Sequence, residues 1–411
     1  MLSISAPGQP WYVFSLDKVF RLMFVLSLLL IVINLDRFGI KGNPVEKLVM
    51  ILTLVVLYFK NGIPKNILVL VSVILGITLI SAIFTDHPQF SWKYYFNGLI
   101  SFMVFLFLLV TRLNSKDVFF VMRFMCLLPF ICLVVGVVYF AAGISSVYGV
   151  DFLGVVRLKG SIEAAYFGAL AGNAVIASVF LLDRTGEKKY LLLAVVNLGF
   201  MLLSGSRMAT AITVMNTFFL FFWGFNGRTS FKFYLTYFGV LILSPAIIYL
   251  SIGLFTRFGS DSMSGRDILW EYFEHISQLY HNFGVGLGHQ YILIDERLKE
   301  LTKTVAAHNE YLRLQLEIGY YMSWMVFALI GLMLMVHILN VRKKINVNFL
   351  AYASSVFSFY IFCITDNAMS VTFIFMHFWL VGLASMDYKS PLATGVTESS
   401  VFRSISARGG N

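Results

Sequence analysis

Long runs of apolar residues recur along the whole chain. They lie near residues 19–35, 45–59, 66–84, 96–110, 118–143, 163–182, 190–204, 207–224, 233–255, 318–339, 348–364 and 369–387. An α-helix of about 20 apolar residues is long enough to cross a bilayer. The pattern therefore predicts an all-α polytopic membrane protein with about twelve transmembrane helices.

The spacing of these runs predicts how the chain is divided. Every connection is short except the one at 256–317. We expect helices one to nine within 1–255 and an extramembrane loop with short helices at 256–317. Helices ten to twelve follow within 318–387, and the polar residues 388–411 form a cytoplasmic tail.

Lysine and arginine are distributed unevenly between the two sides of the predicted bundle. The short connections on one side carry only Arg37, Lys41, Lys93, Arg157, Lys159 and Arg207, and the other side carries many more. Positively charged short loops stay in the cytoplasm. This predicts that both termini are cytoplasmic and the long loop is outside, which is the periplasm if the host is Gram-negative.

Composition narrows the class of protein further. The chain is 59% hydrophobic and 13% charged, with a mean hydropathy of +0.82, which excludes a soluble domain. We assign the net charge of +10 to contact with anionic lipid headgroups, so the expected partner is the lipid bilayer and not nucleic acid. The cysteines lie inside apolar runs, and no metal-binding motif is present, so we expect no metal and no cofactor.

A cation lies where one apolar run begins on the predicted outer side. In LLSGSRMATA (202–211), Ser204-Gly205-Ser206 forms a turn, and Ser206 is a suitable N-cap for the next helix. Arg207 then occupies the first turn of a membrane helix. It either binds an anion or only anchors the helix end at the interface.

A second arginine starts a predicted helix in the long loop. In DSMSGRDILWEYFEHISQLY (261–280), Ser264 and Asp267 fit a capping box around Arg266. Apolar residues follow at helical spacing: Leu269, Phe273, Ile276 and Tyr280. Free backbone N–H groups beside a guanidinium suit an anion, although a solvated arginine on a surface helix gives the same pattern.

A third basic segment is VVRLKGS (155–161), where Arg157 and Lys159 alternate with apolar residues. By itself it is compatible with an ordinary surface loop. Together the three segments place several cations on one side of the bilayer. Arginine suits bidentate phosphate binding, so we expect a site for a phosphate-bearing, membrane-embedded ligand.

The segment AHNEYLRLQLEIGY (307–320) adds acid–base chemistry on the same side. His308 can act as a base near neutral pH, and Asn309, Glu310 and Tyr311 can orient it or bind hydroxyl groups. An isolated loop histidine without a function is the alternative. The glycine-containing turn at 282–290 could let backbone approach a ligand, but no nucleotide-binding loop is indicated.

The chain resembles the O-antigen ligase and polymerase superfamily of bacterial membrane glycosyltransferases. The resemblance rests on SGSRMA (204–209), SGRDILW (264–270), GVGLG (284–288) and AHNEYLRLQLEIG (307–319), and on the long loop between the ninth and tenth helices. It implies a GT-C-like fold. It also implies metal-independent, inverting transfer of a glycan from undecaprenyl pyrophosphate, and for a ligase the acceptor is a sugar hydroxyl of the lipid A-core.

The resemblance also implies a role for each matching residue. Arg207 and Arg266 would bind the pyrophosphate, and His308 would activate or position the acceptor hydroxyl. Arg157 and Lys159 would add donor contacts. Second-shell groups on the acceptor side would be Asn309, Glu310, Tyr311 and Gln315.

Two alternatives remain open at this stage. A polymerase joining carrier-linked repeat units shares the same segments, and the Arg157-x10-Gly168 spacing occurs in some polymerase loops. A non-catalytic transporter of lipid-linked glycans also fits twelve helices. We favour the ligase because one outer loop dominates and because the charges lie at helix ends, with Arg123 the main exception.

Overall fold

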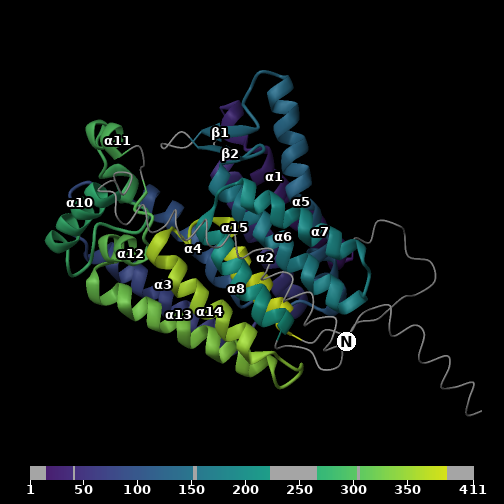
Figure 1. Ribbon diagram of the computed structural model, residues 1–411. Helices are drawn as coiled ribbons and strands as arrows, with labels where there is room; N and C mark the ends of the chain where they lie inside the picture. The colour runs from purple at the N-terminus through teal and green to yellow at the C-terminus, as the bar shows by residue number, and fades with distance from the viewer. Residues whose placement is uncertain (1–14, 40–41, 151–154, 223–265, 303–305, 387–411) are drawn as a thin grey trace, which may run out of the picture.

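The computed structural model describes residues 15–39, 42–150, 155–222, 266–302 and 306–386 (Figure 1). The N-terminal helices are α1 (Leu16–Ile33), α2 (Gly42–Asn61), α3 (Lys65–Phe84), α4 (Trp92–Leu109), α5 (Ser115–Ala141), α6 (Ala164–Thr185), α7 (Lys189–Leu203) and α8 (Arg207–Phe222). The C-terminal helices are α10 (Arg266–Leu279), α11 (Glu296–Thr302), α12 (Glu310–Ile318), α13 (Tyr320–Val341), α14 (Phe349–Thr365) and α15 (Thr372–Ala384). Short 3-10 turns occupy Leu35–Phe38 and Gln290–Ile292.

The predicted apolar runs that fall within the described residues all coincide with helices. Among these residues α3, α4, α5, α6 and α13 are long and apolar enough to cross a bilayer, so this is a helical membrane protein. The predicted run at 233–255 and the tail at 388–411 lie outside the described residues. The total of about twelve spans therefore stays a prediction.

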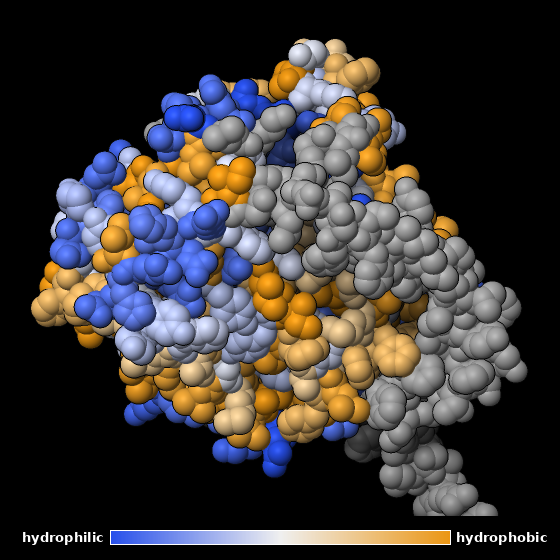
Figure 2. All heavy atoms as spheres, turned by 60° about the vertical axis from the view of Figure 1, so that its left-hand side comes forward, coloured by the Kyte–Doolittle hydropathy of each residue, from blue (hydrophilic) through white to orange (hydrophobic). Residues whose placement is uncertain are grey.

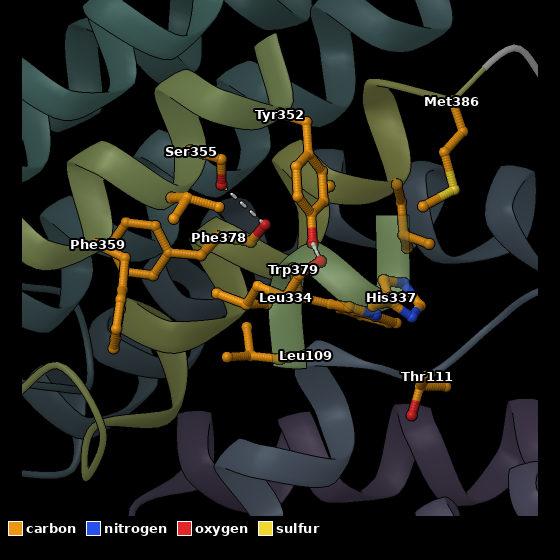
Figure 3. A pocket seen from close by; sticks show the side chains of 13 residues that line it. Leu109, Thr111, Leu334, His337, Tyr352, Ser355, Phe359, Phe378, Trp379 and Met386 are labelled. Carbon is orange, nitrogen blue, oxygen red and sulfur yellow. Dashed lines mark hydrogen bonds between the residues drawn. The ribbon is translucent and has the colours of Figure 1, made fainter. Parts of the chain in front are cut away.

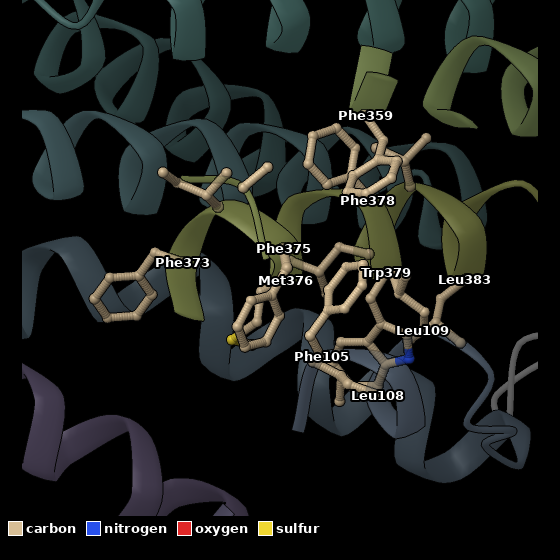
Figure 4. Packing of buried hydrophobic residues seen from close by; sticks show 14 of the residues in the cluster. Phe105, Leu108, Leu109, Phe359, Phe373, Phe375, Met376, Phe378, Trp379 and Leu383 are labelled. Atoms are coloured by element: carbon tan, nitrogen blue, oxygen red, sulfur yellow. The ribbon is translucent and has the colours of Figure 1, made fainter. Parts of the chain in front are cut away.

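Helix α15 is the centre of the bundle. It has 13 residues, all buried, and it contacts α4, α6, α8 and α14. Phe105 of α4 stacks on Phe359 of α14 with ring centroids 5.5 Å apart, and Phe359 meets Phe378 of α15 at 5.4 Å (Figure 4). At 1.5 Å per residue α15 is only about 20 Å long, shorter than the hydrocarbon core of a bilayer.

A second, smaller core lies in the predicted outer loop, where α10, α11 and α12 sit together at the left of Figure 1. Leu269 and Phe273 of α10 are buried there, and Ile276 and Tyr280 pack against them, as their helical spacing predicts. The cluster also contains Val285, Ile294, Ala307 and Leu316. Viewed from this side, hydrophilic residues gather above a broad hydrophobic belt (Figure 2).

One element departs from the all-α expectation. Tyr148–Val150 (β1) and Val156–Leu158 (β2) form an antiparallel hairpin in which Gly149 faces Arg157. The alternation of apolar and charged residues around Arg157 is the period of a strand. The basic segment is therefore a hairpin edge and not an irregular loop.

The membrane helix that was expected to begin near residue 318 is preceded by a separate short helix. Helix α12 ends at Ile318, Gly319 adopts a φ of 90°, and α13 starts at Tyr320. A Cβ at Gly319 would lie 2.3 Å from the carbonyl oxygen of Asn282, so only glycine fits. The polar stretch 307–319 is therefore a separate, largely buried helix and not the first turn of a membrane span.

Candidate functional site

His308 lies beside a carboxylate that the sequence did not indicate. Its Nδ1 is 3.1 Å from Oδ1 of Asp366, and both side chains are about four-fifths buried, with exposures of 24% and 20%. Asp366 is the C-cap of α14, far from His308 in the sequence. His308 has a φ of 47°, in the left-handed region that non-glycine residues rarely adopt. Such strained residues concentrate at functional sites.

The arrangement of these two side chains is suited to proton transfer. A carboxylate at one imidazole nitrogen selects the tautomer in which the opposite nitrogen is basic, and it stabilises the imidazolium that forms. Asp366 is itself held in place, because its Oδ1 also accepts from the backbone N–H of Asn367 at 2.8 Å. The pair can therefore take a proton from a hydroxyl group without a metal.

His308 lines a cavity of about 810 Å³. This volume is within the range of sites that hold drug-sized ligands, about 300–1,000 Å³. Its lining residues include Tyr94, Tyr166 and Tyr291 and the amide residues Asn97, Gln290 and Asn367. Tyrosine offers an apolar face and a polar tip, which matches the C–H faces and hydroxyl rim of a sugar ring.

A buried ion-pair cluster forms one side of this cavity. Arg313 pairs with Glu310 and, through Nη1, with Oε2 of Glu317 at 2.7 Å. Burial acts to lower the pKa of Arg313, but the two carboxylates outweigh it and raise that pKa above its ordinary value. Arg313 is therefore charged, and its guanidinium is already engaged by protein carboxylates.

Three of the residues predicted beside the acceptor have structural partners instead. Asn309 is the N-cap of α12, and its side chain accepts from the N–H of Leu312 at 3.1 Å. Glu310 is fully buried and accepts from the N–H of Met369 at 2.6 Å. Tyr311 stacks on Phe327 at 4.4 Å and donates to the carbonyl of Tyr360. These residues, and Gln315, do not line the cavity.

The predicted donor cations partly converge, around the turn that precedes α8. Arg207 is the first residue of α8 and is half-buried. The side chain of Arg157 lies over Gly205, with Nε 3.2 Å from where a Cβ would be. Lys159 packs its aliphatic part over Gly149 of the hairpin. Arg266 is the first residue of α10, and its side chain lies outside the described structure.

Of these cations, Arg157, Lys159 and Arg207 have described side chains, and none of the three lines the cavity of His308. Gly168 of α6 faces the Ser204–Ser206 turn so closely that a Cβ would lie 2.3 Å from Cβ of Ser206. Tyr166, two residues earlier on the same helix, faces the cavity. Residues two apart on a helix point in nearly opposite directions, so α6 lies between the turn and the cavity.

The glycine turn at 282–290 packs mainly against protein. Gly288 has a φ of 81°, and a Cβ there would lie 2.4 Å from the carbonyl oxygen of Tyr94. The N–H of Gly286 donates to the carbonyl of Glu317 at 2.8 Å. The close approach predicted for a ligand is thus made by α4 and α12, although Gly288 also borders the cavity.

His289 fastens this turn to α4. Its Nε2 accepts from the backbone N–H of Ser91 at 2.8 Å, and its ring stacks on Phe90 with centroids 5.0 Å apart. Burial lowers the pKa of His289 below its usual value of 6.5, although hydrogen bonds to the carbonyls of Leu287 and Gly286 partly oppose this. The histidine is therefore neutral and serves to dock the turn.

A second cavity lies toward the other end of α13, between His337, Tyr352 and Trp379 (Figure 3). Its volume is about 20 Å³, enough for a single water molecule. It offers no room for a sugar. Cavities of about 260 and 300 Å³ also occur in the described structure, but His308 lines neither, so the larger cavity is the candidate site.

Within the described ranges, no group of three or more His, Cys, Asp or Glu side chains is placed to hold a metal ion. No protein-family model, curated protein or solved structure matches the chain.

The sequence analysis did not identify Asp366, which contacts His308, or Lys47, which lines the cavity. A lysine inside a predicted membrane run was the available signal for Lys47.

Proposed function

We propose that the chain is a glycosyltransferase that moves a glycan from undecaprenyl pyrophosphate to a sugar hydroxyl, in the manner of an O-antigen ligase. The observation that carries this is the His308–Asp366 pair at the wall of a cavity of about 810 Å³. Tyrosine and amide side chains of that cavity suit a sugar. The resemblance to O-antigen ligases and polymerases supports the same reaction; it rests on segments 204–209, 264–270, 284–288 and 307–319.

The reaction follows from the proposed roles. The acceptor hydroxyl of the lipid A-core gives its proton to the imidazole of His308, and Asp366 stabilises the imidazolium. The hydroxyl oxygen attacks the anomeric carbon as the bond to the pyrophosphate breaks, which inverts the configuration. The pyrophosphate leaves with the bonding electrons. The resemblance assigns the neutralisation of its charge to Arg207 and Arg266, with Arg157 and Lys159 as further donor contacts, although α6 separates Arg207 from the cavity of His308.

This assignment places the protein in the inner membrane of a Gram-negative bacterium. Both termini would be cytoplasmic, and the face carrying α10, α11 and α12 would be periplasmic, as the distribution of lysine and arginine predicts. The substrates would then reach the cavity from the outer leaflet. No nucleotide sugar is needed there, because the donor is already activated by its carrier.

One observation favours a transporter of lipid-linked glycans as the second candidate. Lys47 lies within α2 and faces the cavity, and ionisable residues inside membrane helices often mark substrate pathways. The structure gives less support to a polymerase than to a transporter. The Arg157-x10-Gly168 spacing has a packing reason, because only glycine fits where α6 meets the Ser204–Ser206 turn.

Lipopolysaccharide gels of a deletion strain, with carrier-linked glycans extracted in parallel, test the assignment. For a ligase, polymer is absent from the core and full-length chains accumulate on the carrier. If single repeat units still reach the core and only chain growth is lost, the protein is a polymerase. If His308→Ala restores transfer as well as the wild type does, catalysis by this pair is excluded and a transporter is favoured.

A further inference from the structure

Lys47 presents an ammonium group to the candidate cavity from inside a helix. It lies near the start of α2, and its Nζ donates to Oγ of Ser101 on α4 at 2.5 Å. Both residues line the cavity of about 810 Å³ that also contains His308. An ammonium has three donors, and the serine hydroxyl uses one of them.

Within the described structure, no carboxylate forms an ion pair with Lys47. Glu46 is its neighbour in sequence, but adjacent helix residues do not face each other. Glu46 borders an adjoining cavity of about 300 Å³, which shares Tyr166, Ser370 and Val371 with the larger one. Glu46 attracts Lys47 electrostatically but forms no ion pair with it within the described residues.

The other buried cation of the cavity cannot take the role of Lys47. Arg313 is paired with Glu310 and Glu317, and it is near enough to Lys47 for their like charges to repel. Lys47 is therefore the cavity-lining cation that has no ion-pair partner among the described residues. Lys299 also lines the cavity, but it pairs with Glu296 at 2.6 Å.

A partly buried charge without an ion-pair partner is costly, so such a residue is a candidate for contact with a ligand or a partner charge. The cavity is large enough for that ligand, and its tyrosine and amide lining suits the attached sugar. An anionic group close to Lys47 would gain a charge-assisted hydrogen bond in a site shielded from water.

We propose that Lys47 binds an anionic group of the glycan substrate, so that the large cavity is an anion subsite as well as a sugar subsite. The proposal rests on the proposed function. The anion is either a phosphate of the lipid carrier or a carboxylate of an acidic sugar, which share the oxygen chemistry that an ammonium recognises. Lys47 then supplies a positive charge on the cavity side of α6, opposite the turn that carries Arg207.

Binding to the full-length protein in detergent tests the subsite. The probes are farnesyl pyrophosphate and tetragalacturonate, measured by microscale thermophoresis against the wild type, Lys47→Met and Lys47→Arg. The control is Lys93→Met, which removes the same charge from an exposed position at the start of α4. We expect Lys47→Met to weaken one probe about tenfold, which corresponds to about 1.4 kcal/mol. Lys47→Arg should retain most of the affinity, and Lys93→Met should match the wild type.

The two probes distinguish the sources of the anion. Selective loss of farnesyl pyrophosphate binding assigns Lys47 to the carrier phosphates, and selective loss of tetragalacturonate binding assigns it to an acidic sugar. If Lys47→Met, folded by size-exclusion chromatography, binds both probes like the wild type, the subsite is wrong while glycan transfer can still hold. If the wild type binds neither probe, the subsite is also wrong. Absence of glycan transfer by the wild type would instead overturn the proposed function.

Discussion

The imidazole Nδ1 of His308 and the carboxylate Oδ1 of Asp366 lie 3.1 Å apart. This contact connects the segment just before α12 to the C-terminal end of α14. The contact is made by a histidine in the left-handed backbone region. A strained backbone that aims a basic side chain at a carboxylate is costly unless the geometry is used. The contact is therefore the first to test by substitution.

His308→Ala should lower the rate of glycan transfer by a factor on the order of 10²–10⁴, because a positioned base contributes about that much. Asp366→Asn should also slow transfer, since an amide cannot stabilise the imidazolium. The measurement is transfer in proteoliposomes supplied with carrier-linked glycan and lipid A-core. Asp86→Asn, at an exposed position between α3 and α4, is the control and should leave the rate unchanged. Equal rates for Asp366→Asn and the wild type would remove Asp366 from the mechanism.

Arg313→Met should destabilise the protein by about 3–5 kcal/mol, because it leaves Glu310 and Glu317 as buried carboxylates without their cation. Thermal unfolding in detergent, followed by size-exclusion chromatography, measures the loss. The control is Lys299→Met, which breaks an exposed pair with Glu296 and should cost less than about 1 kcal/mol. A melting temperature for Arg313→Met equal to that of the control would contradict the buried cluster.

Gly288→Ala should separate the glycine turn from α4. Its φ of 81° and the 2.4 Å approach of a Cβ to the Tyr94 carbonyl leave no room for a side chain. Gly76→Ala in α3 is the matched control, because no atom lies within 4 Å of its Cβ position. The control should be neutral or more stable by about 0.5–1 kcal/mol, as alanine is the better helix former. Unchanged melting of Gly288→Ala would show that the turn is not docked as described.

Acidification should loosen the same turn. Burial lowers the pKa of His289 in the folded state. Below pH 6.5 the histidine therefore binds a proton more readily in the unfolded chain than in the folded protein. The stability from this group is present above its unfolded pKa of 6.5 and is lost as pH falls through that value toward the lowered one. Burial also lowers the pKa of the nearby His87, which adds to the trend.

Hydrogen exchange of residues 284–292 at pH 7 and pH 5.5 checks this dependence. Intrinsic amide exchange is slower at pH 5.5, so protection factors, which correct for it, are compared. They should be smaller at pH 5.5 in the wild type, and the decrease should be less in His289→Gln, whose amide oxygen can still accept from Ser91. The exposed His275→Gln should behave like the wild type. A pH response of the same size in His289→Gln would exclude His289 as its source.

Asn309→Ala should reduce stability by about 1 kcal/mol while leaving transfer per folded molecule close to that of the wild type, because Asn309 caps α12 and does not line the cavity. Asn309→Ser should recover most of the stability, since serine is also a good N-cap. If Asn309→Ser were stable and yet inactive, the amide would instead contact the acceptor.

Local patterns in the sequence predicted the helices well and the site only in part. Apolar runs located the membrane helices, and the spacing of Leu269 and Phe273 predicted the loop helix and its buried face. Asp366 was missed because its partner is distant in the chain and no local pattern marks it. Glu310 was predicted beside the acceptor, but its polarity serves a buried ion pair, a distinction that depends on tertiary packing.

The complete burial of α15 bears on how the protein is made. Helices emerge from the ribosome in chain order, so α4, α6 and α8 enter the membrane before the helix that they surround. These helices cannot complete their packing until α15 is present, because each of them contacts it. Truncation before residue 372 should therefore leave a bundle without its central helix, which is a substrate for quality-control proteases.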